Sequence, residues 1–350
     1  MEKFLVTEKE RAYLRELAKK QREYANLPEN KEKERLWYLH NRLQGERPMV
    51  VMEEFSFEED ILPRSQCESP FARSLERIIQ RQLINHELIR DDKVTQDHLV
   101  LNSAIHLKEF NIDYTRQLAK ETSIAYQFEH VMTDLEEDLP KLRHSVFSYD
   151  EEEDRKKLEA ANDILGDILP VEIKNQHLEW YLVPTAKAVK LMGMENFMIE
   201  MASNPEGVHD FMSFMADDMD AYLDWMEKNN LLTMNNGNDY AGAGSFGFTD
   251  ELQRPEGAIT TRNLWGNLNS QESSSISPQM YGELIFPYYQ RLAKRFGLVY
   301  YGCCEPVHPI WEKYLSTLDN LRKVSISAWC DEEFMGAALK GTKTIYSRKP

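Results

Sequence analysis

Residues 273–306 read SSSISPQMYGELIFPYYQRLAKRFGLVYYGCCEP, and this stretch decides the fold. Ser277 is a typical helix N-cap, Pro278 suits the first helical turn, and Gly297 suits the end of the helix. The short apolar run 297–302 that follows is typical of a buried strand. A helix that leads directly into such a strand favours parallel strands joined by right-handed crossovers. The stretch therefore predicts either a closed (β/α) barrel or an open doubly wound sheet.

Seven further β-type runs occur along the chain, and helical patterns separate most of them. They are PMVVM (48–52), HLVLNSA (98–104), VEIKNQHLEWYL (171–182), LLTMNN (231–236), NLWGNL (263–268), RKVSISAW (322–329) and TKTIYS (342–347). Eight runs in total match a (β/α)8 TIM barrel, which we predict as the fold. The chain ends soon after the last run. Either it is truncated and lacks the last helix, or N-terminal helices take that place.

The domain organisation follows from these runs. Residues 1–45 are polar with apolar residues at helical spacing, which predicts a two-helix N-terminal extension. Residues 46–350 form the predicted barrel. The segment from about 107 to 170 is longer than a crossover needs, and we expect it to be a helical insertion.

Composition limits the partners of the chain. It has 350 residues with 42 Lys and Arg against 59 Asp and Glu, a net charge of −17. Nucleic acid and anionic membranes are improbable partners because phosphate contacts need clustered basic residues. No apolar run is long enough for a membrane span, and the start lacks the apolar region of a signal peptide. We therefore expect a cytoplasmic protein; helices left uncovered at the barrel's end could pair across a homodimer.

The candidate site residues follow the predicted strands, because reactive residues of a parallel barrel gather at the C-terminal strand ends. Those that we predict to bind substrate are Glu53, Asn236, Asn267 and Tyr301. Those that we predict to be catalytic are His177, Glu179 and Asp239. His177 and Glu179 point the same way on a strand, which suits proton transfer but equally a buried hydrogen-bonded pair. Asp239 also fits a turn. The predicted site contains almost no Arg or Lys.

Two cysteines give the sharpest chemical signal. Cys303 and Cys330 follow consecutive predicted strands, whose tips are about 5 Å apart in a parallel sheet. Thiolate and imidazole are ligands that Zn²⁺ prefers, so we predict Cys303 and Cys330 as zinc ligands, with Glu305 or His308 as a third. The alternative is that these cysteines are small buried apolar residues.

Gly242, Gly244 and Gly247 spell G-x-G-x-x-G after a predicted strand. A dinucleotide site would need a helix next, but Pro255 and Gly257 interrupt that stretch. We therefore expect a mobile glycine-rich loop beside the site.

Three stretches together resemble the uroporphyrinogen decarboxylase superfamily. They are VEIKNQHLEWYLVPTAKAVKLMGMENFMIEMASNPEGVHDFMSFMADD (171–218), SSSISPQMYGELIFPYYQRLAKRFGLVYYGCCEP (273–306) and WCDEE (329–333). The resemblance covers roughly residues 170–335 and implies a (β/α)8 barrel. The superfamily includes decarboxylases and corrinoid methyltransferases.

The methyltransferase branch resembles this chain better than the decarboxylases do. Where decarboxylases carry an Arg-rich motif for substrate carboxylates, this chain has RPMVVMEEFSFEED (47–60), whose acidic residues would repel a polycarboxylate. Methyltransferases of the superfamily bind zinc through a His-x-Cys motif and a later Cys. Cys303 matches the motif's cysteine, but Tyr301 stands in place of the histidine. Cys330 follows the seventh predicted strand, whereas the second cysteine of those enzymes comes later.

The resemblance implies a zinc-dependent methyltransferase, in which zinc acts as a Lewis acid. It would move a methyl group between a small-molecule methyl donor or acceptor and a corrinoid carried by a partner protein. One alternative is a uroporphyrinogen decarboxylase-like carboxy-lyase on a non-standard substrate, which needs no metal. The other is a non-catalytic barrel that binds a ligand.

Overall fold

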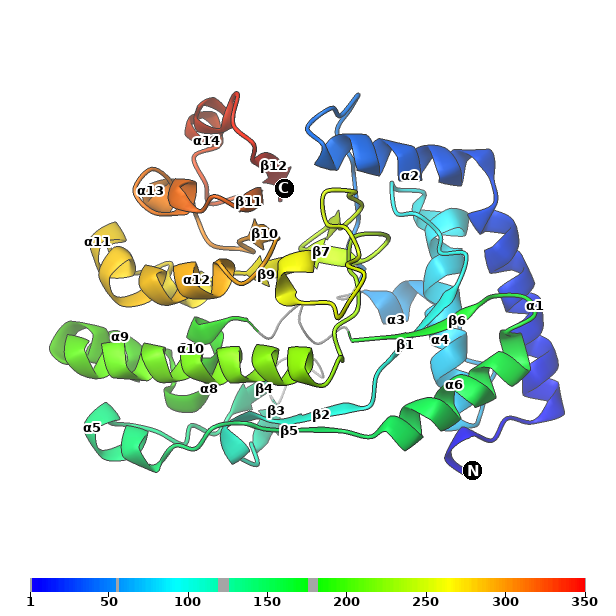
Figure 1. Cartoon of the computed structure of the whole chain (residues 1–350), viewed down its shortest axis with the longest axis horizontal. Helices are drawn as coiled ribbons and strands as arrows, with labels where there is room; N and C mark the ends of the chain where they lie inside the picture. Colours follow the sequence, from blue (N-terminus) through cyan, green and yellow to red (C-terminus); the bar gives the residue numbers. More distant parts are fainter. Residues whose placement is uncertain (1, 55–56, 119–125, 176–181, 350) are drawn as a thin grey trace.

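The computed structural model describes residues 2–54, 57–118, 126–175 and 182–349, and it has a mixed α/β architecture (Figure 1). Within these residues, no helix has both the length and the apolar character that a membrane span requires. The prediction of a mixed α/β chain with parallel strands is confirmed.

Six of the eight predicted runs form parallel strands. Four of them make one sheet in the order β12-β11-β10-β9, and the other two pair with each other. The bounds are β1 (Leu99–Asn102), β6 (Val171–Lys174), β9 (Trp265–Leu268), β10 (Leu298–Tyr301), β11 (Leu321–Ile326) and β12 (Ile345–Arg348). Strands β9, β10 and β11 are buried throughout, as is usual in parallel sheets, although β9 is the last strand of this one.

The run 231–236 is not a strand, because side chains take the bonds that a strand backbone would make. The Asn235 side chain accepts from Trp265 N at 2.9 Å and donates to Trp265 O at 3.0 Å. On the other side, Asn175 N donates to Thr233 Oγ1 at 3.3 Å. The segment thus lies between β6 and β9 but joins them mainly through side chains.

The run 48–52 is also not a strand, for a similar reason. Val50 N donates to Asp92 Oδ2 and Met52 N donates to Asp91 Oδ2, each at 2.7 Å. Two carboxylates therefore satisfy the backbone donors of this run. A closed eight-stranded barrel is not confirmed, since the parallel pairing in the described residues remains divided between two sheets.

Helices cover the strands in two groups (Figure 1). Around β1 and β6 lie α1 (Glu8–Ala25), α4 (Pro70–Ile84) and α6 (Glu151–Leu165). Around β9 to β11 lie α8 (Pro184–Met192), α9 (Met194–Ser203), α10 (Pro205–Lys228), α11 (Pro278–Met280) and α12 (Phe286–Ala293). Each group has its own apolar core.

The remaining helices are short, apart from α2 (Pro28–Asn41), the second helix of the N-terminal extension. They are α3 (Glu58–Ile61), α5 (Leu135–Asp138), α13 (His308–Trp311) and α14 (Glu332–Leu339). The π-helical turns are Asn85–Ile89 and Tyr281–Ile285. The 3₁₀ turns are Glu2–Phe4, Glu109–Asn111, Leu139–Lys141, Thr261–Asn263, Gln271–Ser273 and Leu315–Thr317.

The segment 107–170 is not wholly helical, contrary to the expectation for the insertion. Antiparallel pairs join β2 (Ile105–Lys108) to β5 (Val146–Tyr149) and β3 (Arg116–Leu118) to β4 (Tyr126–Phe128). In Figure 1, β2 and β5 form a long ribbon that links the two helix groups.

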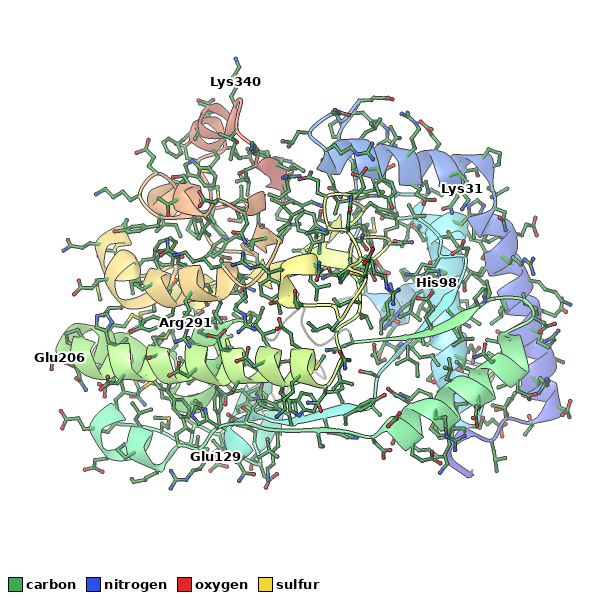
Figure 2. The ribbon with its side chains drawn as sticks, viewed as in Figure 1. Lys31, His98, Glu129, Glu206, Arg291 and Lys340 are labelled. Atoms are coloured by element: carbon green, nitrogen blue, oxygen red, sulfur yellow. The ribbon has the colours of Figure 1, made fainter. Side chains whose placement is uncertain are left out.

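Ion pairs fix α12 against α10. Arg291, labelled in Figure 2, pairs with Asp217 at 2.7 Å and with Asp220 at 2.8 Å. Arg295 of the following turn pairs with the other oxygen of Asp220 at 2.9 Å. Ion pairs as well as apolar packing therefore hold these two helices together beside β9 and β10.

The buried Glu10 carboxylate joins the start of α1 to the start of α4. It accepts from Thr7 N, Glu68 N and Ser69 N at 2.8–2.9 Å. The backbone N–H of Ser69, followed by those of Thr7 and Glu68, lowers the pKa of Glu10 to about 2, against a cost from burial. The folded state therefore gains stability from the ionised form above the ordinary pKa of 4.5, and this gain is lost as the pH falls towards 2.

Glu10→Gln is thus expected to lower the free energy of unfolding by about 1.5–3 kcal/mol at pH 7. Urea unfolding at pH 7 and near pH 2.5 measures the effect, which should shrink at the lower pH. Glu8→Gln, in the same turn but exposed, is the control, with a change within about 0.5 kcal/mol. An equal effect of Glu10→Gln at both pH values would show that its charge does not stabilise the fold.

Candidate functional site

A cavity of about 370 Å³ lies between the β1–β6 pair and β9, and we call it the central cavity. Its size is within the range of small-molecule sites. Many of the lining residues are polar. Asn102, Lys174, Asn175 and Asn267 come from the C-terminal parts of β1, β6 and β9 or directly follow them, and Asn235, Asn238, Asp239 and Tyr240 come from the segment between α10 and β7. The C-terminal ends of three parallel strands therefore form one part of the wall, where parallel barrels place their active sites.

One ion pair faces the central cavity. Lys174 ends β6, and its Nζ donates to Asp239 Oδ1 at 2.7 Å. The other oxygen of Asp239 accepts from Gly237 N at 3.2 Å. Both side chains are largely removed from water, with 19% of Lys174 and 15% of Asp239 exposed. A paired amine and carboxylate at a cavity wall can hold, donate or accept a proton.

Other walls of the central cavity combine amides with aromatic rings. Asn102 ends β1 directly opposite Lys174 in the strand register, and the buried Asn267 lies on β9. The rings of Trp265 and Phe246 complete this part of the wall. Amide groups give hydrogen bonds of both polarities, while rings contact apolar parts of a ligand. The site therefore suits a small molecule with polar groups.

A second cavity of about 180 Å³ adjoins the first and shares Tyr240, Gln96 and Phe246 with it. The predicted residue Glu53 lines this second cavity. Its carboxylate accepts from Tyr240 O–H and from Gly244 N, each at 2.7 Å. Glu53 thus positions the Tyr240 ring between the two cavities.

The cations around both cavities are paired with carboxylates of the protein. Arg81 lines both cavities and donates twice to Glu58 at 2.8 Å. Burial raises the pKa of Glu58, but Arg81 and Arg77 outweigh it and lower that pKa to about 2. Lys93 pairs with Glu54 in the second cavity. A ligand consequently meets walls that carry little net charge.

The glycine-rich segment is a hairpin, with β7 (Tyr240–Gly242) antiparallel to β8 (Ser245–Phe246). A side chain at Gly242 would collide with the ring of Tyr300, since an added Cβ would lie 2.3 Å from it. Gly244 has a φ of +61°, which favours glycine at the turn. The buried Lys323 donates to Ser245 Oγ and Phe246 O at 2.7 Å. The segment therefore lies beside the central cavity, as expected, but it is a packed and anchored hairpin and not the mobile loop that the glycines predicted.

Three of the predicted site residues, Asp239, Asn267 and Glu53, line the two cavities. Asn236 instead donates to Leu252 O at 2.7 Å and holds its loop. His177 and Glu179 lie outside the described residues. Nothing in these contacts tests the chemical roles that we predict for these residues.

Tyr301 belongs to a buried hydroxyl chain away from both cavities. Its O–H is 2.6 Å from Ser270 Oγ and 2.7 Å from Tyr281 O–H. Ser270 N in turn donates to Glu305 Oε1 at 2.8 Å. The Tyr301 side chain is fully buried, and its hydroxyl joins β10 to the segment after β9 and to the π-helical turn Tyr281–Ile285.

The four predicted zinc ligands do not converge. Across the described ranges, no three His, Cys, Asp or Glu side chains are grouped so that they could hold a metal ion. Each predicted ligand has another contact: Cys303 Sγ with Cys304 Sγ at 3.6 Å, Glu305 with Cys303 N at 2.8 Å, Cys330 Sγ with Val307 N at 3.4 Å, and His308 Nδ1 with Asp331 N at 3.2 Å. These donors do not fit a zinc centre in this arrangement, and we assign no reaction step to zinc.

Sequence reasoning missed the cations of the site. The predicted site contained almost no Arg or Lys, yet Lys174 and Arg81 line the central cavity. The sequence predicts one strand over 171–182, but β6 ends at Lys174. With that end known, the strand-end rule leads to Lys174. Arg81 lies on α4, for which no strand-end signal exists.

Comparison with known proteins gives little further information. No protein-family model matches the chain, and no curated protein matches it. Among solved structures, a methyltransferase from Methanosarcina mazei is similar at 11% identity and a TM-score of 0.46, over 90% of this chain and 82% of that one. A likeness at this level assigns neither family nor reaction, and the resemblance to the uroporphyrinogen decarboxylase superfamily stays an interpretation of the sequence.

Proposed function

We propose that this chain is an enzyme that moves a methyl group between a small polar molecule in the central cavity and a corrinoid carried by a partner protein. The observation that carries the proposal of a catalytic site is the Lys174–Asp239 pair at the cavity wall. The reaction class comes from the sequence resemblance over residues 170–335.

The walls favour a substrate that carries little net charge. The ammonium of Lys174 is balanced by Asp239, and the guanidinium of Arg81 is balanced by Glu58. A polycarboxylate would have to displace these partners, at an electrostatic cost in a partly desolvated site. A small methyl ether or methyl thioether is uncharged and meets the amides and rings without that cost, whereas a methylamine is a cation near pH 7.

The residues of this chain would act on the group that loses the methyl. When a C–X bond of the substrate breaks, the electron pair stays on the heteroatom X, and the methyl goes to the reduced corrinoid supplied as co-substrate. Lys174 can release a proton to X, while Asp239 holds the Lys174 side chain and balances its charge.

Zinc stays a prediction from the resemblance. Metal analysis of protein purified without chelator tests it directly. Near-stoichiometric zinc that is lost in a Cys303→Ser, Cys330→Ser double variant would support the predicted ligand set, in an arrangement different from the one described. Absence of zinc would remove it from the proposal but leave the cavity chemistry.

One observation favours the carboxy-lyase as a second candidate. The central cavity offers the Lys174–Asp239 pair and the guanidinium of Arg81, which a single carboxylate could share with Glu58, while the predicted metal ligands do not line it. Decarboxylation needs a cation for the carboxylate and a proton donor for the product carbanion, but no metal. This candidate predicts release of CO₂ without any methyl acceptor.

A single panel separates these functions. The full chain is incubated anaerobically with free cob(I)alamin and a set of small methyl ethers, methylamines and methyl thioethers, and methylcobalamin is followed by absorbance. We expect methylcobalamin to form with at least one compound class, faster than without protein. Release of CO₂ from small carboxylates with no methyl transfer would support the carboxy-lyase. Binding without either product would support a non-catalytic ligand-binding protein.

A further inference from the structure

The two thiols of Cys303 and Cys304 touch each other at the C-terminal end of β10. Their Sγ atoms are 3.6 Å apart. Gly302, with a φ of +100°, turns the chain out of the strand just before them. Cys304 is exposed and Cys303 is half-buried. Adjacent side chains usually point apart along a strand, so this contact depends on the turn.

We propose that Cys303 and Cys304 form a vicinal dithiol site, which binds a soft, thiophilic ligand through both sulfurs, with an aryl compound of trivalent arsenic as the matching ligand class. Thiol sulfur is a soft donor and prefers soft acceptors. Because the sulfurs are already in contact, one bridging atom can reach both with little movement. This inference does not depend on the reaction proposed above.

A bridging ligand suits this pair better than a disulfide does. A disulfide bond is about 2.05 Å long, and its Cα atoms are usually about 4.4–6.8 Å apart. Adjacent Cα atoms are only about 3.8 Å apart across a trans peptide. Closing a bond between Cys303 and Cys304 would therefore strain the backbone, whereas a bridge over the present 3.6 Å separation would not.

The surroundings of Cys304 have room for an aryl substituent. A cavity of about 490 Å³ is lined on one side by Cys304, Trp329, Met194 and Pro306, and its polar lining consists of Gln271, Glu272, Ser274 and Glu305. Trp329 is 76% exposed, so its ring is available to stack on another ring. A planar apolar group attached to the bridging atom would cover this exposed ring.

The bridge forms when both thiols condense with the reagent, whose arsenic already carries one oxo oxygen. With an aryl arsenoxide, two As–S bonds form and the bonds from arsenic to its oxo oxygen break. Both thiol protons leave with that oxygen as one water molecule. No atom changes oxidation state.

Phenylarsine oxide tests the site on the intact chain. Native mass spectrometry should show one adduct at the reagent mass minus one water, which is the signature of a bridge. Titration of the denatured adduct should find two free thiols, because the sequence has 4 cysteines and two would be blocked. An adduct at the full reagent mass, or three remaining thiols, would mean attachment to one sulfur and would overturn the proposal. So would the absence of an adduct.

Variants locate the bridge. Cys304→Ser and Cys303→Ser should each abolish the minus-water adduct, while Cys330→Ser and Cys67→Ser should retain it. Melting curves of each variant confirm that it is folded. Retention of the bridged adduct in Cys304→Ser would place the arsenic elsewhere and contradict the assignment.

Trp329→Ala tests the aryl part separately. The wild-type chain should bind phenylarsine oxide more tightly than arsenite. In the variant, the ratio of the two dissociation constants should fall by about threefold to tenfold. An unchanged ratio would show that Trp329 does not contact the ligand and would overturn the aryl specificity. The dithiol bridge is tested separately by the mass measurement.

Discussion

Asp239→Asn is expected to lower the rate of methyl transfer by up to about 10²–10⁴-fold, because it removes the partner that positions the proton donor Lys174, and a positioned proton donor contributes a factor of that size. The amide keeps the shape of the carboxylate but removes its charge. Lys174 Nζ would lose the partner that lies 2.7 Å away and holds it at the wall of the central cavity. The substrate would still meet the same amides and rings, so its KM should change less than kcat.

Initial rates of methylcobalamin formation measure this effect, at a temperature where the melting curve shows the variant folded. Asp250→Asn is the matched control, because Asp250 pairs with Arg42 at the surface, outside both cavities. The control should stay within about twofold of wild type, as expected for an exposed ion pair. A rate for Asp239→Asn within twofold of wild type would remove the Lys174–Asp239 pair from the chemistry.

Trp37→Ala is expected to lower the free energy of unfolding by about 3–5 kcal/mol. Trp37 of α2 is 1% exposed and packs against Phe246 and Phe248. Its Nε1 donates to Asp92 O at 2.8 Å, next to the carboxylate that holds Val50. The change would leave a cavity where the N-terminal extension meets the β7–β8 hairpin, and Phe246 would lose support at the wall of the central cavity.

Urea unfolding compares this variant with Trp329→Ala, which removes an indole that is 76% exposed. The control should change the free energy of unfolding by no more than about 0.5 kcal/mol. If Trp37→Ala costs less than about 1 kcal/mol, α2 does not pack on the hairpin as described.

Much of the strand pattern could be predicted because buried parallel strands are rich in apolar residues. The runs at 263–268, 297–302 and 322–329 became β9, β10 and β11, and the Ser277-capped helix precedes β10 as expected. β10 is apolar throughout, as burial on both faces favours, whereas β9 and β11 also bury polar residues such as Asn267 and Lys323.

Two of the predicted runs are not strands, and their local sequence gives no sign of this. Whether 231–236 becomes a strand depends on the Asn235 amide, which takes both backbone groups of Trp265 thirty residues away. Whether 48–52 does so depends on Asp91 and Asp92. Apolar periodicity contains no information about such distant side-chain bonds.

The candidate site could be predicted in part, because some of its residues follow predicted strands. Asp239 and Asn267 follow or end β-type runs, so the strand-end rule led to them. Lys174 was missed because the end of β6 lies within an apolar-rich run that continues beyond it. The thiol pairing depends on the turn at Gly302, which brings Cys303 against Cys304, its neighbour in sequence.

A crystal structure of the chain with the methyl compound that reacts in the panel tests the central claim most directly. We predict density for the compound between β1, β6 and β9, with its heteroatom within hydrogen-bond distance of Lys174 Nζ. Density instead beside Cys304 and Trp329, with the central cavity holding only solvent, would contradict the assignment of the site.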